Sequence, residues 1–102
     1  PLTSKMADIA LEMVKNSVEA FFNFDKDLAQ NTILQDDVVD ALFDEITNLA
    51  INDFETLKTK PGFGVYLLFV AKYIERIADH ATNICEWIIY IVSGNHPISQ
   101  ID

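Results

Sequence analysis

Hydrophobic residues recur along the chain at the three- and four-residue spacing of helices that bury one face. The pattern predicts three long helices, at residues 3–24, 26–58 and 63–93. Neither glycine nor proline occurs between Leu2 and Lys60 or between Val65 and Ser93, so each helix can run uninterrupted. The predicted buried stripes are Leu2, Met6, Ile9, Met13, Ala20, Phe21 and Phe24; then Leu28, Thr32, Val39, Leu42, Ile46 and Leu49; then Leu67, Ala71, Ile74, Ala78, Ala81, Cys85, Ile88 and Val92.

Residues that begin or end helices lie between these stripes. Asn23 offers a break, Asp25 an N-cap, and Gly94 a C-terminal stop. Because the second helix is long for a globular protein, the sequence allows a kink or a break near Gln35–Asp36. The tail at 95–102 shows no periodicity and is expected to fray. The chain is therefore predicted to be one all-α domain over 1–102, an up-down-up bundle of three long antiparallel helices.

Composition narrows the class of protein. Half of the 102 residues are apolar, which excludes intrinsic disorder. The net charge of −9 disfavours binding to a nucleic acid, whose backbone is also negative. The single cysteine cannot form an internal disulfide, which suits a reducing compartment. The longest apolar runs fall far short of the roughly 20 residues that span a bilayer.

The acidic residues are unevenly distributed. Residues 27–57 contain eight acids and no lysine or arginine. Asp36, Asp40 and Asp44 follow one another at four-residue spacing, and the first two fall beside the apolar stripe. Carboxylates in that position need either water or a cation. The eight acids are Asp27, Asp36, Asp37, Asp40, Asp44, Glu45, Asp53 and Glu55.

The third helix repeats this arrangement with Glu75 and Asp79, four residues apart. Two such pairs on neighbouring helices would bring four carboxylates together, a set of oxygen ligands that suits Mg²⁺, Mn²⁺ or Fe. The alternative is a solvated acidic face, with Glu75 paired to Lys72 and Asp79 to Arg76. Asp36, Asp40, Glu75 and Asp79 are thus the candidate metal ligands.

Other reactive side chains offer little chemistry. Cys85 lies on an apolar stripe and is interpreted as core, and His80 as a surface or partly packed residue; His96 is assigned no role. The sequence has no phosphate-binding glycine loop and no C-x-x-C motif. Neither histidine has a glutamate three residues before it, as a diiron bundle requires. We therefore expect no enzyme, although a metal-dependent enzyme using the same four acids is a further hypothesis.

The third helix also carries a motif that resembles a known family. The stretch Ile-Glu-Arg-Ile-Ala-Asp-His-Ala-Thr-Asn-Ile-Cys-Glu at residues 74–86 is similar to the signature of the PhoU family of phosphate-uptake regulators. Residues 87–94 resemble the end of that family's second, C-terminal repeat. Upstream landmarks, including Ala20, Phe21 and the cluster at residues 36–40, agree in order and spacing.

The resemblance implies a three-helix bundle with a metal site on Asp36, Asp40, Glu75 and Asp79. Asp37 is a substitute for Asp36 and Asn83 a further candidate ligand. Iron or zinc is the expected metal, with manganese and magnesium as other candidates.

The resemblance also implies a cytoplasmic homodimer that is not an enzyme and that regulates phosphate uptake and starvation signalling negatively. Its partners would be the phosphate ABC transporter ATPase and a sensor histidine kinase, so it would meet the membrane only through them. Full-length members carry two repeats, so this chain corresponds to a trimmed half or to a single repeat joined to another module. The alternative is a metal-free structural or dimerisation module attached to a transporter or channel regulator.

Overall fold

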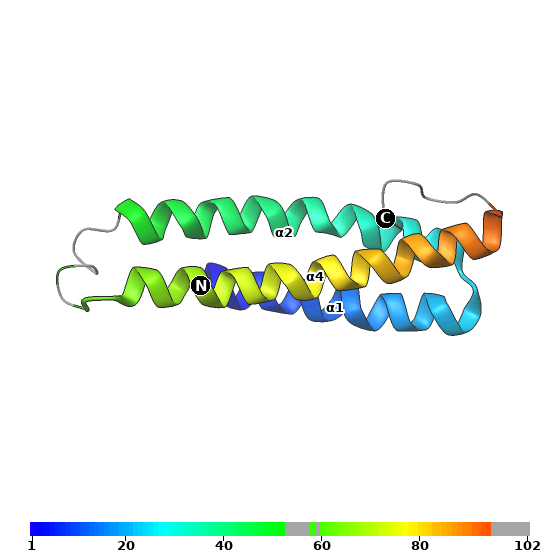
Figure 1. Cartoon of the computed structure of the whole chain (residues 1–102), viewed down its shortest axis with the longest axis horizontal. Coiled ribbons are helices and arrows are strands. Elements are labelled where there is room, and N and C mark those ends of the chain that lie inside the picture. The colour runs from blue at the N-terminus through cyan, green and yellow to red at the C-terminus, as the bar shows by residue number, and fades with distance from the viewer. Residues whose placement is uncertain (53–57, 59, 95–102) are drawn as a thin grey trace.

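Three helices arranged side by side make up the part of the chain that the structure describes, residues 1–52, 58 and 60–94 of a computed structural model. The helices are α1 (Leu2–Asn23), α2 (Lys26–Asn52) and α4 (Phe63–Ser93). In Figure 1, α1 and α4 run in one direction along an elongated bundle and α2 returns in the other. This confirms the predicted all-α, up-down-up three-helix bundle.

A tight two-residue connection joins α1 to α2. Phe24 adopts a left-handed conformation with φ 50°, and the backbone N–H of Asp25 donates to the carbonyl of Ala20 at 2.9 Å. The side chain of Asp25 then accepts a hydrogen bond from the backbone N–H of Leu28 at 3.0 Å. Asp25 is therefore the predicted N-cap of α2.

Removing this cap should destabilise the bundle modestly. We expect Asp25→Ala to lower the free energy of unfolding by about 1 kcal/mol, because one backbone N–H of the first turn loses its acceptor. Asp25→Asn should retain most of the stability, since an amide oxygen can accept the same bond. Urea denaturation of the two variants measures the difference, and equal stability would show that the cap contributes nothing.

The expected break in the second helix is wrong. The helix α2 continues through Gln35 and Asp36 without interruption from Lys26 to Asn52. Nothing in this stretch prevents helical hydrogen bonding, because it lacks proline and glycine. The predicted extension to residue 58 crosses residues 53–57, which lie outside the described part, as does the tail at 95–102. At the end of α4, Gly94 has φ 76° and its N–H donates to the carbonyl of Tyr90 at 2.7 Å, as a C-terminal stop should.

The core lies along the axis where the three helices meet. Large side chains come from α1 and α2, including Met6, Met13 and Ile46, while α4 supplies small ones at the same level. Small residues on α4 allow the other two helices to approach it closely and still fill the interior. The main cluster contains Met6, Ala10, Met13, Val39, Leu42, Ile46, Ala71, Ala78 and Ala81; a second contains Ala20, Ala29, Cys85 and Ile88.

Four residues assigned to the buried stripes are instead exposed: Phe21 (48%), Phe24 (62%), Leu49 (49%) and Val92 (43%). Each lies close to the end of a helix, where the neighbouring helices leave side chains partly uncovered. In Phe24 the left-handed backbone also takes the side chain off the helix face. Conversely, Ser17 is fully buried and its hydroxyl donates to the carbonyl of Val14 at 2.7 Å. No described helix combines the length and apolar character needed to cross a membrane.

Candidate functional site: the carboxylates between α2 and α4

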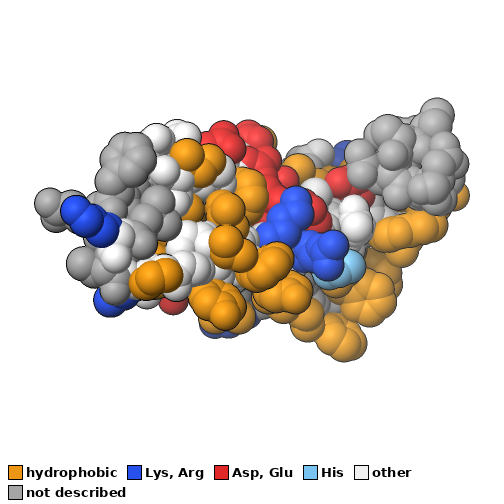
Figure 2. Space-filling view, turned by 60° about the vertical axis from the view of Figure 1, so that its left-hand side comes forward, with side chains coloured by type: hydrophobic (Ala, Val, Ile, Leu, Met, Phe, Trp, Pro, Cys, Tyr) orange, Lys and Arg blue, Asp and Glu red, His pale blue; other side chains and the backbone are white. Residues whose placement is uncertain are grey.

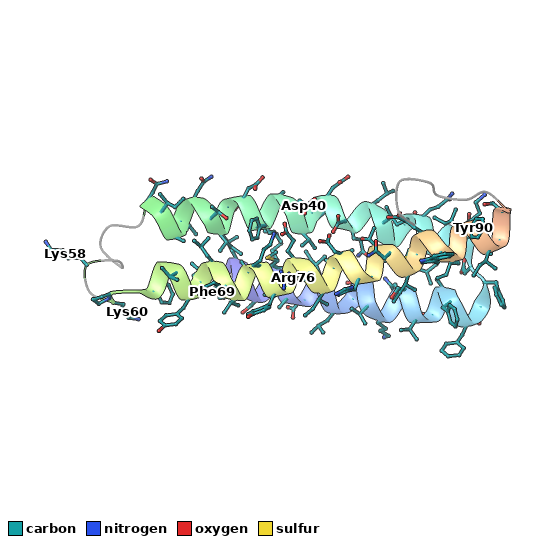
Figure 3. All side chains as sticks on the ribbon, viewed as in Figure 1. Asp40, Lys58, Lys60, Phe69, Arg76 and Tyr90 are labelled. Carbon is teal, nitrogen blue, oxygen red and sulfur yellow. The ribbon has the colours of Figure 1, made fainter. Side chains whose placement is uncertain are left out.

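The four candidate ligands lie along the line where α2 and α4 run side by side. Asp36 and Asp40 belong to α2, and Glu75 and Asp79 belong to α4. The two helices are antiparallel, so Asp36 lies at the level of Asp79 and Asp40 at the level of Glu75. Figure 3 labels Asp40 on α2, and Figure 2 shows acidic side chains gathered in a band. We call these four residues the acidic row.

Asp36 is the least favourably placed of these carboxylates. It is half-buried, and its Oδ1 atom is shielded from solvent without a hydrogen-bond partner among the described residues. Burial, followed by the negative charges of Asp40 and Asp79, raises the pKa of Asp36 to about 6. The fold therefore holds this side chain in a position that disfavours its ionised form.

Neighbouring negative charges also act on Asp40, although its side chain is exposed. Partial desolvation is the largest cause of its raised pKa, and the charges of Glu75 and Asp79 across the helix interface raise the pKa further. Repulsion therefore acts from α4 to α2 as well as within α2. The charges of Glu75 and Asp79 on α4 thus disfavour the ionised forms of Asp36 and Asp40 on α2.

Lys72 supplies positive charge at one end of the acidic row. Its Nζ lies 2.8 Å from Oε1 of Glu75 and 5.6 Å from the centre of the Phe43 ring. The ion pair expected under the alternative interpretation of Glu75 is thus present. The lysine side chain is 56% exposed, so solvent screens the pair and its net stabilisation is small.

The acidic row is not a ready-made coordination shell. Among residues 1–52, 58 and 60–94, no three His, Cys, Asp or Glu side chains are placed together so that they could hold a metal ion. Carboxylate oxygens nevertheless suit hard cations as ligands. Oδ1 of Asp36 has no described hydrogen-bond partner, so its lone pairs are available to such a cation.

Two further side chains, which were not among the candidate ligands, have an oxygen hidden from solvent. Oε2 of Glu86 is hidden from solvent without a described hydrogen-bond partner, and burial raises the pKa of this carboxyl. Gln35 donates through Nε2 to Oε1 of Glu12 at 3.3 Å, while its own Oε1 has no described partner. The sequence could have pointed to Glu86, because it lies seven residues after Asp79 and therefore on the same side of α4. Asp37 and Asn83, the two additional candidates, are both exposed.

Cys85 and His80 differ in environment. The Cys85 side chain is fully buried, and burial raises the pKa of its thiol to about 11 even though a hydrogen bond with Thr32 opposes the shift. The thiol therefore stays protonated near neutral pH and acts as core, as predicted. His80 is exposed on α4, and His96 lies outside the described residues.

Fold and site together define a small helical-bundle domain with an acidic row between two of its helices. The chain belongs to the PhoU family, since residues 3–88 match the PhoU domain. It is 37% identical over 89 residues to a phosphate-specific transport system accessory protein PhoU homolog from Clostridium acetobutylicum, covering 87% of this chain and 41% of that protein. A homolog from Thermotoga maritima is 30% identical over 86 residues, covering 84% of this chain and 37% of that protein.

A third relative of the same printed name, from Rhizobium meliloti, is 33% identical over 96 residues, covering 90% of this chain and 39% of that protein. No solved structure matches the chain. The chain thus spans about two fifths of the length of these curated relatives.

Proposed function

We propose that the chain is a regulatory domain of phosphate transport that acts by protein–protein contact. The observation that carries this proposal is the match to the PhoU domain over residues 3–88, together with relatives named as accessory proteins of a phosphate-specific transport system. An accessory role is regulatory, so the proposal includes no catalytic step.

In this proposal the domain works in the cytoplasm as a negative regulator. Its partners are the phosphate ABC transporter ATPase and a sensor histidine kinase, and it reaches the membrane only through them. The length and the acidic surface of the bundle support a role in contact: the three helices present long faces, and the net charge of −9 would attract basic surfaces.

We also propose that Asp36, Asp40, Glu75 and Asp79 bind a metal ion, iron or zinc first, with manganese and magnesium as other candidates. The bound ion supplies positive charge. Asp36 and Asp40 would hold it from α2, and Glu75 and Asp79 from α4. The partnerless Oδ1 of Asp36 and its raised pKa support the proposal, because a cation would relieve both.

Such an ion would link the site to regulation through the relative positions of two helices. Without it, like charges on α2 and α4 repel each other across their interface. With it, the same side chains would tie the helices together and fix the surface that a partner contacts. Metal binding would therefore change rigidity more than fold.

The first test is the metal content of the protein purified without chelator or affinity metal. We expect stoichiometric iron, zinc or manganese in the unmodified chain and a loss of most of it in Asp79→Ala, measured by elemental analysis. Asp8→Ala, which removes an exposed carboxylate from α1, is the matched control and should keep the metal.

The absence of metal, with a melting temperature that neither chelator nor added cations change, would overturn the metal site. The metal-free structural or dimerisation module on a transporter or channel regulator would then be the better description. The partner contacts need a separate test, in which the purified chain is titrated against the purified ATPase and kinase. Binding to neither would contradict the regulatory contact.

A further inference from the structure

One lysine is built against the acidic row. Among residues 1–52, 58 and 60–94, Lys72 is the only lysine or arginine that forms an ion pair, and its partner is Glu75, a member of the row. The lysine Nζ lies 2.8 Å from Oε1 of Glu75. Figure 2 shows basic side chains bordering the acidic band. The chain has only 7 lysines and arginines against 16 acids, and it places one of them directly on a candidate metal ligand.

Phe43 holds this lysine at the interface between the two helices. The Nζ atom of Lys72 lies 5.6 Å from the centre of the Phe43 ring, within the distance at which an aromatic face attracts an ammonium group. Phe43 is half-buried and packs against the main core cluster, so its ring has a fixed place on α2. Lys72 thus contacts Glu75 on its own helix and Phe43 on the helix that carries Asp36 and Asp40.

The other three carboxylates of the acidic row have no such partner. Asp36, Asp40 and Asp79 form no ion pair with any residue that the structure describes. Arg76, which Figure 3 labels on α4, was predicted from its spacing to pair with Asp79; it is exposed and has no described ion pair. The positive charge contributed by this chain therefore meets the acidic row at Glu75.

We propose that Lys72 sets how tightly the acidic row binds a metal ion, because its ammonium group competes with the ion for Glu75. This inference rests on the proposed metal site and deepens it by naming the residue that regulates its occupancy. A site weakened in this way fills only at a higher concentration of free metal than four unpaired carboxylates require. Lys72 thereby raises the metal concentration at which α2 and α4 become tied together.

Either position of the ammonium group weakens metal binding. If it stays beside Oε1 of Glu75, it lies close to the bound ion, and the two positive charges repel each other. If it moves away, its ion pair with Glu75 and its contact with Phe43 are lost. A hydrogen bond that orients a ligand strengthens metal binding instead, but a lysine that is 56% exposed orients its partner weakly. Competition therefore decides the sign of the effect.

Titration of the metal-free protein with Zn²⁺, and separately with Mn²⁺, tests this proposal. In isothermal titration calorimetry, Lys72→Met should lower the dissociation constant on the order of tenfold, because it removes a positive charge next to a divalent ion. Methionine keeps an unbranched apolar side chain at this position. Lys72→Arg keeps the charge and should bind metal like the unmodified chain.

Lys15→Met is the matched control. Lys15 is an exposed lysine of α1, so the substitution makes the same change in net charge away from the acidic row. Its dissociation constant should stay close to that of the unmodified chain. With chelator present, the melting temperatures of Lys72→Met and Lys15→Met should agree, because an exposed ion pair contributes little to stability. A difference in metal affinity then reflects the site rather than the fold.

Phe43→Leu is a second variant that tests the same competition from α2. It removes the aromatic ring and keeps an apolar side chain, so Lys72 is held less firmly at the interface. We expect the dissociation constant to fall about twofold. In Phe43→Leu/Lys72→Met there is no ammonium group for the ring to hold. The double variant should therefore bind metal no more tightly than Lys72→Met alone.

The outcomes separate this inference from the proposed metal site. Equal dissociation constants for Lys72→Met and the unmodified chain, or weaker binding by Lys72→Met, would overturn the inference and leave the metal site standing. Equal tightening by Lys72→Met and Lys15→Met would also overturn it, because net charge alone would then account for the change. If neither the unmodified chain nor any variant binds Zn²⁺ or Mn²⁺, the proposed metal site fails, and the competition fails with it.

Discussion

Replacing Ile46 by alanine should lower the free energy of unfolding by about 2–5 kcal/mol, the usual cost of removing a large aliphatic side chain from a close-packed core. Ile46 is 1% exposed and packs in the main cluster with Met6, Met13 and the small residues of α4. Those neighbours come from two other helices, so they cannot collapse into the cavity without moving a helix. For a bundle of this size the loss is a large fraction of total stability.

Leu49→Ala is the control for this prediction. Leu49 is three residues further along α2 and belongs to the same predicted stripe, yet it is 49% exposed. We expect its replacement to cost less than about 1 kcal/mol. Urea denaturation followed by circular dichroism measures both variants. If the two substitutions lower the free energy of unfolding equally, Ile46 is not packed in the core more tightly than Leu49.

Asp36→Asn should change both the stability of the protein without metal and its response to added cations. Without metal, the variant should be more stable than the unmodified chain at pH 7, because it removes a half-buried charge repelled by its neighbours. The folded state raises the pKa of Asp36 from its ordinary value of 3.8 to about 6, so it binds more protons than the unfolded state between these values. Stability of the unmodified chain should therefore fall as the pH rises from 4 to 6, and stay low above that window.

The raised pKa of Asp36 also sets the size of the expected gain in stability. A tenfold change in the acid dissociation constant corresponds to about 1.4 kcal/mol, and partial solvation of the carboxylate reduces the effect. We expect Asp36→Asn to gain on the order of 1 kcal/mol at pH 7 and to lose most of the slope between pH 4 and 6.

Added metal should reverse this order of stability. A ligand that binds only the folded state adds about 2.7 kcal/mol at a hundred times its dissociation constant. The unmodified chain should gain this stabilisation from the metal that elemental analysis identifies. Asp36→Asn should gain little, because it lacks one charged ligand.

Thermal melts with chelator and with metal, at pH 5 and pH 7.5, measure both responses. Asp8→Asn carries the same change in net charge away from the acidic row and should behave like the unmodified chain. Equal stabilisation of Asp36→Asn and the unmodified chain by metal would remove Asp36 from the site. Destabilisation of Asp36→Asn in chelator would contradict the repulsion described for the metal-free protein.

The sequence by itself determined the secondary structure and the family. Helical periodicity predicted all three helices, because a helix that buries one face must place apolar residues three and four apart. Asp25 and Gly94 marked ends that the structure confirms, since their backbone hydrogen bonds depend on local geometry alone. The motif at residues 74–86 pointed to the PhoU family, which the match over residues 3–88 confirms. The spacing also singled out the two acidic pairs.

Only the tertiary structure decided which edge of each helix is covered. Periodicity placed Leu49 in the buried stripe, but at this end of α2 the neighbouring helices cover Ala50 and leave Leu49 49% exposed. Neither the burial of Asp36 nor the charge of Asp79 acting on it follows from spacing within one helix, because both depend on how α2 and α4 lie against each other. The exposure of apolar residues of α4 such as Tyr66 (70%) and Tyr73 (64%) has the same origin. Three helices can enclose only the sides that they turn toward one another, and the sequence of one helix does not say which sides its neighbours reach.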